Sequence, residues 1–274
     1  MGVGYLLGDT VDLRLNDKVA LVTGSTAGIG FAIARSLADE GAHVFVNGRT
    51  QERVDAAVEA IRSQAATIKV DGIVADFSSS AGVEAVIAKL PAVDVLVNNV
   101  GIFEPKPFAE IPDEDWFRFF EINVMSGVRL SRHYLAEMLK RNWGRIIFIS
   151  SESAVQIPPE MVHYGMTKTA QVAVARGLAE SVAGTGITVN SILAGPTRSE
   201  GVGNFLEDLA RQQDVTPENV EKQFFEKVRP SSLLKRFEKP EEVGAVVAFV
   251  ASAQGAIING AALRAEGGVV RSVL

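Results

Sequence analysis

The sequence of 274 residues contains no cysteine, which excludes disulfide bonds and metal sites built from thiolates. Histidine is nearly as scarce: only three are present, and the spacing of His43, His133 and His163 does not match a zinc site. Basic residues are outnumbered by acidic ones, 27 to 33, which gives a net charge of −6. Because binding to nucleic-acid phosphates needs clustered positive charge, we expect neither a metal ion nor a nucleic acid as a partner.

Long apolar segments are also few. The start of the chain, Met1 to Leu15, contains two acids and one arginine and lacks the sustained apolar core of a secretory signal. The longest uncharged run, Val243 to Leu263, has the length of a membrane span. Polar and glycine residues interrupt it, namely Ser252, Gln254, Gly255, Asn259 and Gly260. This pattern favours a buried helix, a turn and a strand, and we expect a cytoplasmic protein without membrane contact.

Apolar runs alternate with amphipathic stretches along most of the chain. Strands are expected at Lys18–Thr23, His43–Asn47, Ile68–Ala75, Val93–Asn98, Arg145–Ser150, Thr188–Leu193 and Ala262–Ala265. Helices are expected at Ile29–Glu40, Gln51–Gln64, Ala81–Leu90, Glu114–Arg141, Val162–Ala183 and Glu241–Ser252. Such alternation predicts an α/β fold with a parallel sheet covered on both faces. The strands are continuous apolar runs, as expected when both faces are buried.

A single domain spanning residues 1–274 is the simplest expectation, because no linker rich in Pro, Gly and Ser divides the chain. Two parts stand outside the alternation: residues 1–16 as an extension, and residues 198–236 as an inserted helical segment. The insertion carries two apolar helical faces, formed by Phe205, Leu206 and Leu209 and by Val220, Phe224, Phe225 and Val228. Two interpretations fit these faces equally well: a lid that excludes water, or ordinary packing onto the rest of the domain.

The first expected strand leads into a glycine-rich turn and then a helix. Its sequence is Thr23-Gly24-Ser25-Thr26-Ala27-Gly28-Ile29-Gly30. Glycines at such a turn let backbone N–H groups approach a pyrophosphate at a helix N-terminus. A tight turn without a ligand is the competing interpretation, but the strand–turn–helix context favours a dinucleotide.

The end of the second expected strand bears on which dinucleotide binds. It reads Asn47-Gly48-Arg49, with no acid to hold the ribose 2′-hydroxyl of NAD. An arginine there suits the 2′-phosphate of NADP, although Arg49 could also be a solvated surface charge. We therefore favour NADP(H) and keep NAD(H) as the alternative.

Tyr164 and Lys168 are four residues apart in an expected helix, so both side chains project from the same face. A nearby ammonium favours the phenolate and lowers the tyrosine pKa from its usual value of about 10. Such a pair can supply a proton to an alkoxide that forms from a carbonyl. The pair alone is common in helices. Ser151, however, follows the strand thirteen residues before Tyr164, at the sheet edge where α/β proteins bind ligands.

Together these motifs resemble the short-chain dehydrogenase/reductases, and among them the 3-oxoacyl-[acyl-carrier-protein] reductase-like members. The resemblance covers about residues 17–270. It rests on the glycine-rich turn, Asn98-Asn99-Val100-Gly101, Asn123, Ser151, Tyr164-x-x-x-Lys168, and Asn190 leading to Gly195-Pro196. It implies a Rossmann-type doubly wound parallel sheet of about seven strands. It also implies hydride transfer between a nicotinamide and a carbonyl or secondary alcohol.

The resemblance assigns a role to each of four catalytic residues. Tyr164 would be the general acid/base, and Lys168 would lower its pKa and bind the nicotinamide ribose. Ser151 would orient the substrate oxygen, and Asn123 would complete a proton relay through a water. The cofactor contacts implied are Gly24, Ser25, Thr26, Gly28, Ile29, Gly30, Arg49, Asp76, Phe77, Asn98, Val100, Gly101, Tyr164, Lys168, Gly195, Thr197 and Ser199.

The substrate is a small carbonyl or alcohol compound that the sequence does not name. Three readings stay open: an NADP(H)-dependent reductase, an NAD-dependent alcohol or polyol dehydrogenase of the same family, and a catalytically silent nucleotide-binding protein. Gln156, Pro158, Pro159, Met161 and His163 are candidates for the pocket lining, with His163 favoured as a helix-start residue. Family members commonly form dimers or tetramers, and we expect a homo-oligomer through the helices at Glu114–Arg141 and Val162–Ala183.

Overall fold

The computed structural model describes residues 12–65, 67–213 and 215–273. Within them, seven strands form one sheet in the order β3-β2-β1-β4-β5-β6-β7, and each neighbouring pair is parallel. The strands are β1 (Val19–Val22), β2 (His43–Gly48), β3 (Val70–Val74), β4 (Val95–Asn98), β5 (Gly144–Ser151), β6 (Ile187–Ala194) and β7 (Ala262–Ala265). This is the predicted Rossmann-type sheet.

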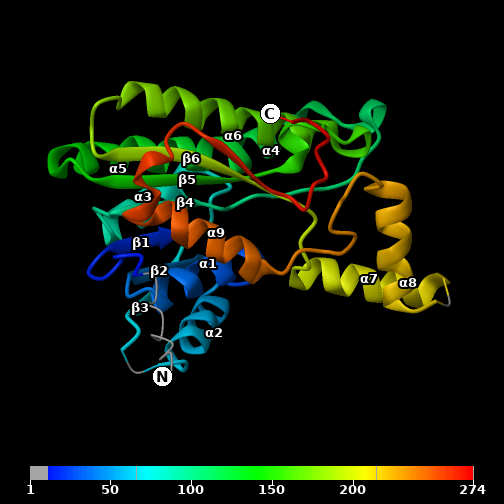
Figure 1. Cartoon of the computed structure of the whole chain (residues 1–274), viewed down its shortest axis with the longest axis horizontal. Coiled ribbons are helices and arrows are strands. Elements are labelled where there is room, and N and C mark those ends of the chain that lie inside the picture. Colours follow the sequence, from blue (N-terminus) through cyan, green and yellow to red (C-terminus); the bar gives the residue numbers. More distant parts are fainter. Residues whose placement is uncertain (1–11, 66, 214, 274) are drawn as a thin grey trace, which may run out of the picture.

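Helices lie on both faces of the sheet (Figure 1). One layer contains α1 (Gly28–Asp39), α2 (Gln51–Arg62) and α9 (Pro240–Ala251). The other contains α3 (Ser80–Lys89), α5 (Ser126–Arg141) and α6 (Val162–Ser181). Alternate side chains of β5 enter the two cores, because successive residues of a strand point to opposite faces. Ile147 contributes to the first core and Phe148 to the second.

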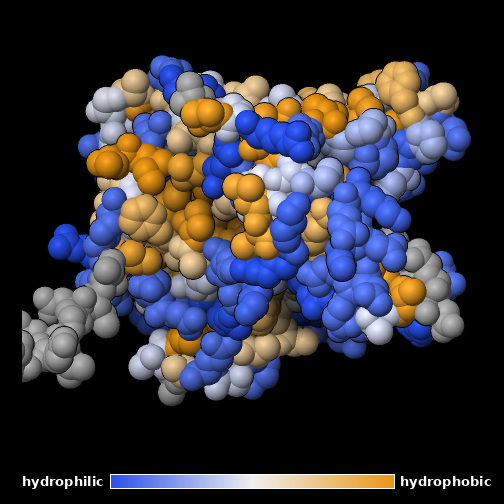
Figure 2. Space-filling model, turned by 45° about the vertical axis from the view of Figure 1, so that its right-hand side comes forward, coloured by the Kyte–Doolittle hydropathy of each residue, from blue (hydrophilic) through white to orange (hydrophobic). Residues whose placement is uncertain are grey.

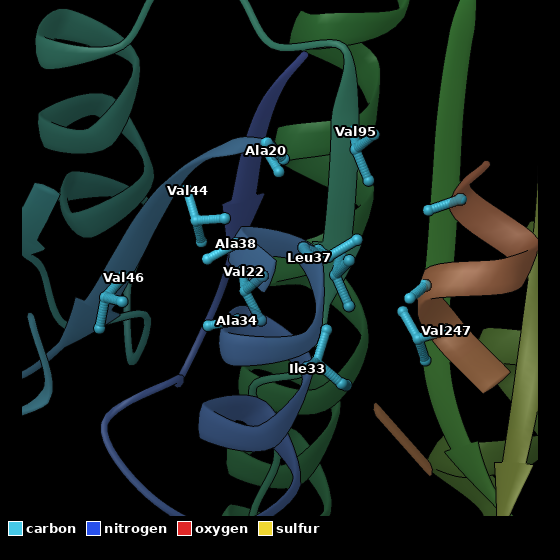
Figure 3. Packing of buried hydrophobic residues seen from close by; sticks show 14 of the residues in the cluster. Ala20, Val22, Ile33, Ala34, Leu37, Ala38, Val44, Val46, Val95 and Val247 are labelled. Atoms are coloured by element: carbon cyan, nitrogen blue, oxygen red, sulfur yellow. The ribbon is translucent and has the colours of Figure 1, made fainter. Parts of the chain in front are cut away.

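The core between the sheet and the first helical layer is made of closely packed aliphatic side chains (Figure 3). Ile33 and Leu37 of α1 are fully buried there, as is Val247 of α9. The helices α1 and α9 approach each other closely at Gly244, where a Cβ would lie 2.9 Å from the Ala32 carbonyl oxygen. A larger residue at 244 would therefore push the two helices apart.

The segment predicted as one helix over 114–141 is divided. It consists of α4 (Asp113–Phe120), a π-helical turn (Glu121–Met125) and α5. A π-helical turn holds one extra residue, and hydropathy periodicity does not reveal such a local insertion because the apolar pattern continues on either side.

The two segments expected to stand outside the alternation differ from each other. Residues 1–11 lie outside the described residues, but Leu13 and Leu15 are buried in the first core, so this part of the predicted extension belongs to the domain. The 198–236 segment forms α7 (Glu200–Gln213), α8 (Pro217–Gln223) and a π-helical turn (Phe224–Val228), which stand beside the sheet (Figure 1). Four of its residues form a small separate core with Phe237, namely Leu206, Ala210, Val220 and Phe225.

The surface combines hydrophilic and apolar areas. On the face that Figure 2 turns forward, apolar side chains gather in one area with hydrophilic side chains around it.

The long uncharged run at 243–263 forms α9, a 3-10 turn (Gln254–Ile257) and β7, as predicted. None of the described helices combines the length and the apolar character needed to cross a membrane.

The strand order reverses direction in the sheet between β1 and β4. From β1 the chain adds β2 and β3 on one side, and from β4 it adds β5, β6 and β7 on the other. Loops at the carboxyl ends of strands diverge at such a point, and the crevice between them binds ligands in open α/β sheets.

Replacing Leu37 with alanine tests the packing between α1 and the sheet. Leu37→Ala should lower the free energy of unfolding by about 2–5 kcal/mol, because it leaves a cavity in a fully buried site. Urea denaturation gives this value. The control Ile257→Ala, at a side chain that is 94% exposed, should cost less than about 1 kcal/mol. Equal losses for the two variants would contradict the core assignment.

Candidate active site

The glycine-rich turn between β1 and α1 has the conformation that its glycines permit. Gly24 and Gly28 have φ values of +60° and +56°, which favour glycine. At Gly30, a Cβ would come within 2.4 Å of the Gly24 carbonyl oxygen. The helix α1 begins at Gly28, and its N-cap residue Ala27 makes no side-chain cap. The N-terminus of α1 therefore keeps the backbone N–H groups that bind phosphate in such folds.

Asn47 and Ser25 hold this turn in place. The Gly24 N–H donates to Asn47 Oδ1 (2.9 Å), and the Asn47 N–H donates to Ser25 Oγ (2.9 Å). Ser25 Oγ in turn donates to the Val22 carbonyl (2.7 Å) from a fully buried side chain. The Ser25 N–H also donates to the Asn47 carbonyl (2.8 Å), so Ser25 shapes the turn, and its cofactor contact stays a prediction. Thr26 and Ile29 are half-buried.

Arg49 and Asp76 follow the ends of β2 and β3. Arg49 is exposed and forms no ion pair with another residue that the structure describes. Asp76 is exposed and accepts a hydrogen bond from the Ser78 N–H (3.0 Å), while Phe77 is buried beneath it in the second core. Both charged side chains therefore remain available at the sheet edge where the resemblance places the adenosine half of the cofactor.

The carboxyl end of β4 lies between the glycine turn and Lys168. A Cβ on Gly24 would lie 2.9 Å from Val100 Cγ2, and one on Gly101 would lie 3.3 Å from Lys168 Nζ. The side chain of Asn98 is buried, and its Oδ1 has no hydrogen-bond partner among the described residues. An unpaired buried acceptor is costly, and a bound ligand with a donor would satisfy it.

Ser151, Tyr164 and Lys168 come together at the end of β5 and the start of α6. Ser151 and Lys168 are buried, and Tyr164 is half-buried. The Ser151 hydroxyl lowers the pKa of Tyr164, so the two side chains are neighbours. Lys168 Nζ lies 5.6 Å from the centre of the Tyr164 ring. This arrangement places a proton donor, a second hydroxyl and a cation around one point.

Burial dominates the titration of both Tyr164 and Lys168. It raises the pKa of Tyr164 above the ordinary 10.0 and lowers the pKa of Lys168 from 10.5 to about 8. Of the charges that act on the Tyr164 pKa, Glu152 raises it and Arg229 lowers it. The groups that act on the Tyr164 pKa do not include Lys168, so the lowering of this pKa by Lys168 stays a prediction.

Asn123 lies in the π-helical turn and is buried. Its Oδ1 accepts from the Ile102 N–H (2.7 Å), and its Nδ2 donates to the Ile102 carbonyl (3.0 Å) and to Thr167 Oγ1 (3.0 Å). The side chain thereby ties the loop after β4 to α6. It is not the exposed helix residue that an ordinary amphipathic helix would place there, and π-helical turns frequently occur at functional sites.

Glu152 and Arg229 form a buried ion pair beside Ser151 that the sequence analysis missed. Arg229 Nε donates to Glu152 Oε1 (2.9 Å), and Glu152 Oε2 accepts from the Ser151 hydroxyl and from the Ser153 N–H (2.7 Å). Arg229 also pairs with Glu160 (3.4 Å). The position of Glu152, directly after a buried strand and Ser151, was an available signal. No local pattern pointed to Arg229, which comes from 77 residues away.

The loop after β6 carries Gly195, Thr197 and Ser199, and it rests on a buried carboxyl group. Glu238 Oε2 accepts from the Gly195 N–H (3.2 Å) and from Thr197 Oγ1 (3.4 Å). Burial raises the pKa of Glu238 from 4.5 to about 7. At the other end of the loop, a Cβ on Gly28 would lie 3.1 Å from Ser199 Cβ, so the loop reaches back to the glycine turn.

His163 belongs to an aromatic cluster and not to the reactive group. It is fully buried at the start of α6, 4.0 Å from the Phe119 ring and 6.0 Å from the Trp116 ring between centroids. Burial lowers its pKa, and neither ring nitrogen has a hydrogen-bond partner among the described residues. This agrees with the prediction that His163 is a helix-start residue.

Phe103 is exposed, and its ring contacts the Tyr164 ring edge-on, with 6.3 Å between the two centroids.

The residues along the sheet edge fit a nicotinamide dinucleotide. Gly24, Gly28 and Gly30 leave room for a pyrophosphate at the start of α1. Lys168 lies at the far end, and its ammonium can donate to a ribose hydroxyl. No group of three or more His, Asp or Glu side chains suited to a metal ion occurs in the described part of the chain.

Comparison with known proteins identifies the family. The short chain dehydrogenase family model matches residues 18–210. The chain is 47% identical to the oxidoreductase YvaG of Bacillus subtilis, over 95% of this chain and 99% of that protein. It is 31% identical to the 3-oxoacyl-[acyl-carrier-protein] reductase FabG of Aquifex aeolicus, over 94% of this chain and all of that protein. The chain therefore belongs to the short-chain dehydrogenase/reductases, oxidoreductases that act on alcohol and carbonyl groups.

Solved structures agree with this assignment. L-Sorbose reductase from Gluconobacter frateurii, in complex with NADPH and L-sorbose, superposes with a TM-score of 0.90 and 29% identity, over 96% of this chain and all of that chain. A reductase of bacilysin biosynthesis, YwfH, which is NADPH-dependent, has a TM-score of 0.83 and 25% identity over 94% of this chain and all of that chain. These neighbours are consistent with use of a nicotinamide cofactor.

Glu238→Gln tests the buried carboxyl group under the Gly195–Thr197 loop. Because the folded-state pKa is raised, the folded protein holds its proton more tightly than the unfolded chain, and stability falls as the pH rises from about 4.5 to about 7. The variant should lack this dependence and exceed the wild type by roughly 1–3 kcal/mol in free energy of unfolding at pH 8. Urea denaturation across this pH range measures it. Glu241→Gln, at an exposed carboxyl group of α9, should leave the dependence intact.

Proposed function

We propose that the chain is an NADP(H)-dependent oxidoreductase that transfers hydride between the nicotinamide and a carbonyl or secondary alcohol substrate. The observation that carries the proposal is the convergence of Ser151, Tyr164 and Lys168 at the end of β5, in line with the glycine turn along one crevice. A catalytically silent nucleotide-binding protein would have no use for this arrangement.

The bound cofactor supplies or accepts the hydride, and the residues of the chain handle the substrate oxygen and the proton. In reduction, Tyr164 donates its proton to the oxygen of the carbonyl group as the carbon receives the hydride. The Ser151 hydroxyl turns its one proton from Glu152 Oε2 to the same oxygen and stabilises the charge that develops on it. The Lys168 ammonium stabilises the phenolate that remains. Burial raises the pKa of the Tyr164 phenol, so the proton is on Tyr164 before reduction begins.

The preference for NADP(H) rests on Arg49. A Cβ on Gly48 would lie 2.4 Å from Thr26 Cγ2, so Arg49 follows a residue that is packed against the glycine turn. Its guanidinium is exposed and forms no ion pair with a described residue, and the adjacent Asn47 and Gly48 bring no carboxylate. A free cation at this place suits a 2′-phosphate. An NAD-dependent alcohol dehydrogenase of the same family is the alternative.

Arg49→Ala tests the cofactor preference. The wild type should bind NADPH more tightly than NADH, and the variant should bind NADPH about 10–100-fold more weakly, because one or two charge-assisted hydrogen bonds to the phosphate are lost. Its NADH affinity should change less than about threefold. Fluorescence titration of the purified protein gives both constants, with Arg132→Ala, at an exposed arginine of α5, as the control. Tighter binding of NADH by the wild type would refute the proposed role of Arg49.

Tyr164→Phe tests the proton donor. The variant keeps the ring and loses only the hydroxyl, so turnover in a screen of carbonyl compounds against NADPH oxidation should fall about 100–10,000-fold. NADPH affinity should stay within about threefold of the wild type, since Lys168 and the glycine turn are unchanged. Retention of turnover would show that another group supplies the proton.

We also propose that the chain forms a homo-oligomer through α4 and α5. Three large apolar side chains are exposed there: Phe117 (75%), Phe120 (39%) and Leu139 (45%). Exposed apolar side chains along a helical segment are typical of contact surfaces between proteins. This supports the part of the expected interface on the 114–141 segment, whereas α6 lies mainly against the sheet and the π-helical turn.

A further inference from the structure

The ammonium of Lys168 is held by two neutral oxygen atoms. Its Nζ donates to the Ile149 main-chain carbonyl (2.9 Å) and to Gln171 Oε1 (3.2 Å). An ammonium has three N–H donors, so one remains for a ligand. Burial is the cause of its lowered pKa, and no acidic side chain contributes to that shift. The titratable group beside it is Tyr164, whose own pKa responds to Glu152 and Arg229.

Gln171 links this ammonium to the π-helical turn. It lies three residues after Lys168 in α6, on the same side of the helix, and only 1% of its surface is exposed. Its Nε2 donates to the main-chain carbonyl of Asn123 (2.5 Å). The carboxamide therefore spans the gap between Lys168 and the Asn123 carbonyl.

We propose that Gln171 is a positioning residue for the reaction: its carboxamide bridges Lys168 Nζ to the Asn123 main-chain carbonyl and fixes the ammonium beside Tyr164. The inference rests on the proposed function, since it assigns Lys168 a task in that reaction. It concerns a residue of this chain that the family motifs do not include.

The chemistry of the two partners selects a glutamine. Lys168 only donates and the Asn123 carbonyl only accepts, so the bridging group must accept at one end and donate at the other. A carboxamide does both in one fixed orientation. It also leaves the positive charge of Lys168 unneutralised, whereas a glutamate would pair with the ammonium and weaken its effect on the phenol. An aliphatic residue would fill the space but leave the ammonium with the Ile149 carbonyl alone.

The first measurement follows the titration of Lys168 directly, without turnover. Protein labelled with ¹³C-lysine is titrated by NMR, with the Lys168 signal assigned by its absence in Lys168→Met. Gln171→Leu has nearly the same volume and lacks the acceptor, so the Lys168 pKa should fall. Gln171→Glu brings a carboxylate, so this pKa should rise. Gln64→Leu, the same substitution at an exposed position after α2, should leave it unchanged.

The second measurement is turnover. In Gln171→Leu, kcat for carbonyl reduction should fall about tenfold, the size expected for the loss of one hydrogen bond to a charged group. KM and the NADPH dissociation constant should stay within about threefold. The high-pH limb of the kcat profile should move to lower pH in Gln171→Leu and to higher pH in Gln171→Glu. If Gln171 only packed the core, the high-pH limb of the kcat profile would keep its wild-type position in both variants.

These results separate the two proposals. If the Lys168 pKa in Gln171→Leu and in Gln171→Glu equals that of the wild type, the proposed role of Gln171 is refuted, whatever the activity of the variants. Absence of NADPH-dependent reduction in the wild type, together with shifted Lys168 titration in the variants, would overturn the proposed function and leave the Gln171 bridge intact. Thermal unfolding checks that each variant is folded, and if Gln171→Leu does not fold, an unshifted titration in Gln171→Glu is by itself the refuting result.

Discussion

Burial of the parallel sheet on both faces confines the polar chemistry of this protein to the carboxyl ends of its strands. Side chains within the strands enter one apolar core or the other, as Ile147 and Phe148 of β5 do. Buried polar groups need hydrogen-bond partners, and a loop can supply these readily where a strand ends. The glycine turn after β1, Asn98 at the end of β4 and Ser151 at the end of β5 all obey this constraint. The site is therefore a line along one edge of the sheet.

Local patterns predicted the fold well, because each strand and most helices carry their own periodicity and the alternation leaves few topologies. They also predicted the residues that the sheet edge brings together, since Ser151 ends a strand and Tyr164 and Lys168 share a helix face. The π-helical turn at Asn123 was not predicted. It adds one residue to a segment whose apolar pattern continues on either side, and such an insertion is visible only from tertiary packing.

The contacts that the sequence did not reveal join residues far apart in the chain. Glu152 meets Arg229 from the helical insertion, and Gln171 meets the main chain of Asn123 from 48 residues away. Glu238 reaches the Gly195 loop from 43 residues away. Each is a charged or amide side chain of a type that usually lies on the surface, and only the tertiary structure shows that it is buried. Their partners follow from the tertiary structure, and no spacing rule within one element encodes them.

The π-helical turn also sets the phase between two helices that form one continuous rod. In an α-helix each residue advances the side-chain direction by about 100°, so one additional residue turns everything beyond it by about that angle. The side chains of α4 and α5 thus follow two different angular registers. Phe119 of α4 meets His163 of α6, whereas Leu130 and Tyr134 of α5 enter the sheet core. Insertion or deletion of a single residue here would rotate one of these two surfaces away from its partner, which makes the length of this segment as constrained as its composition.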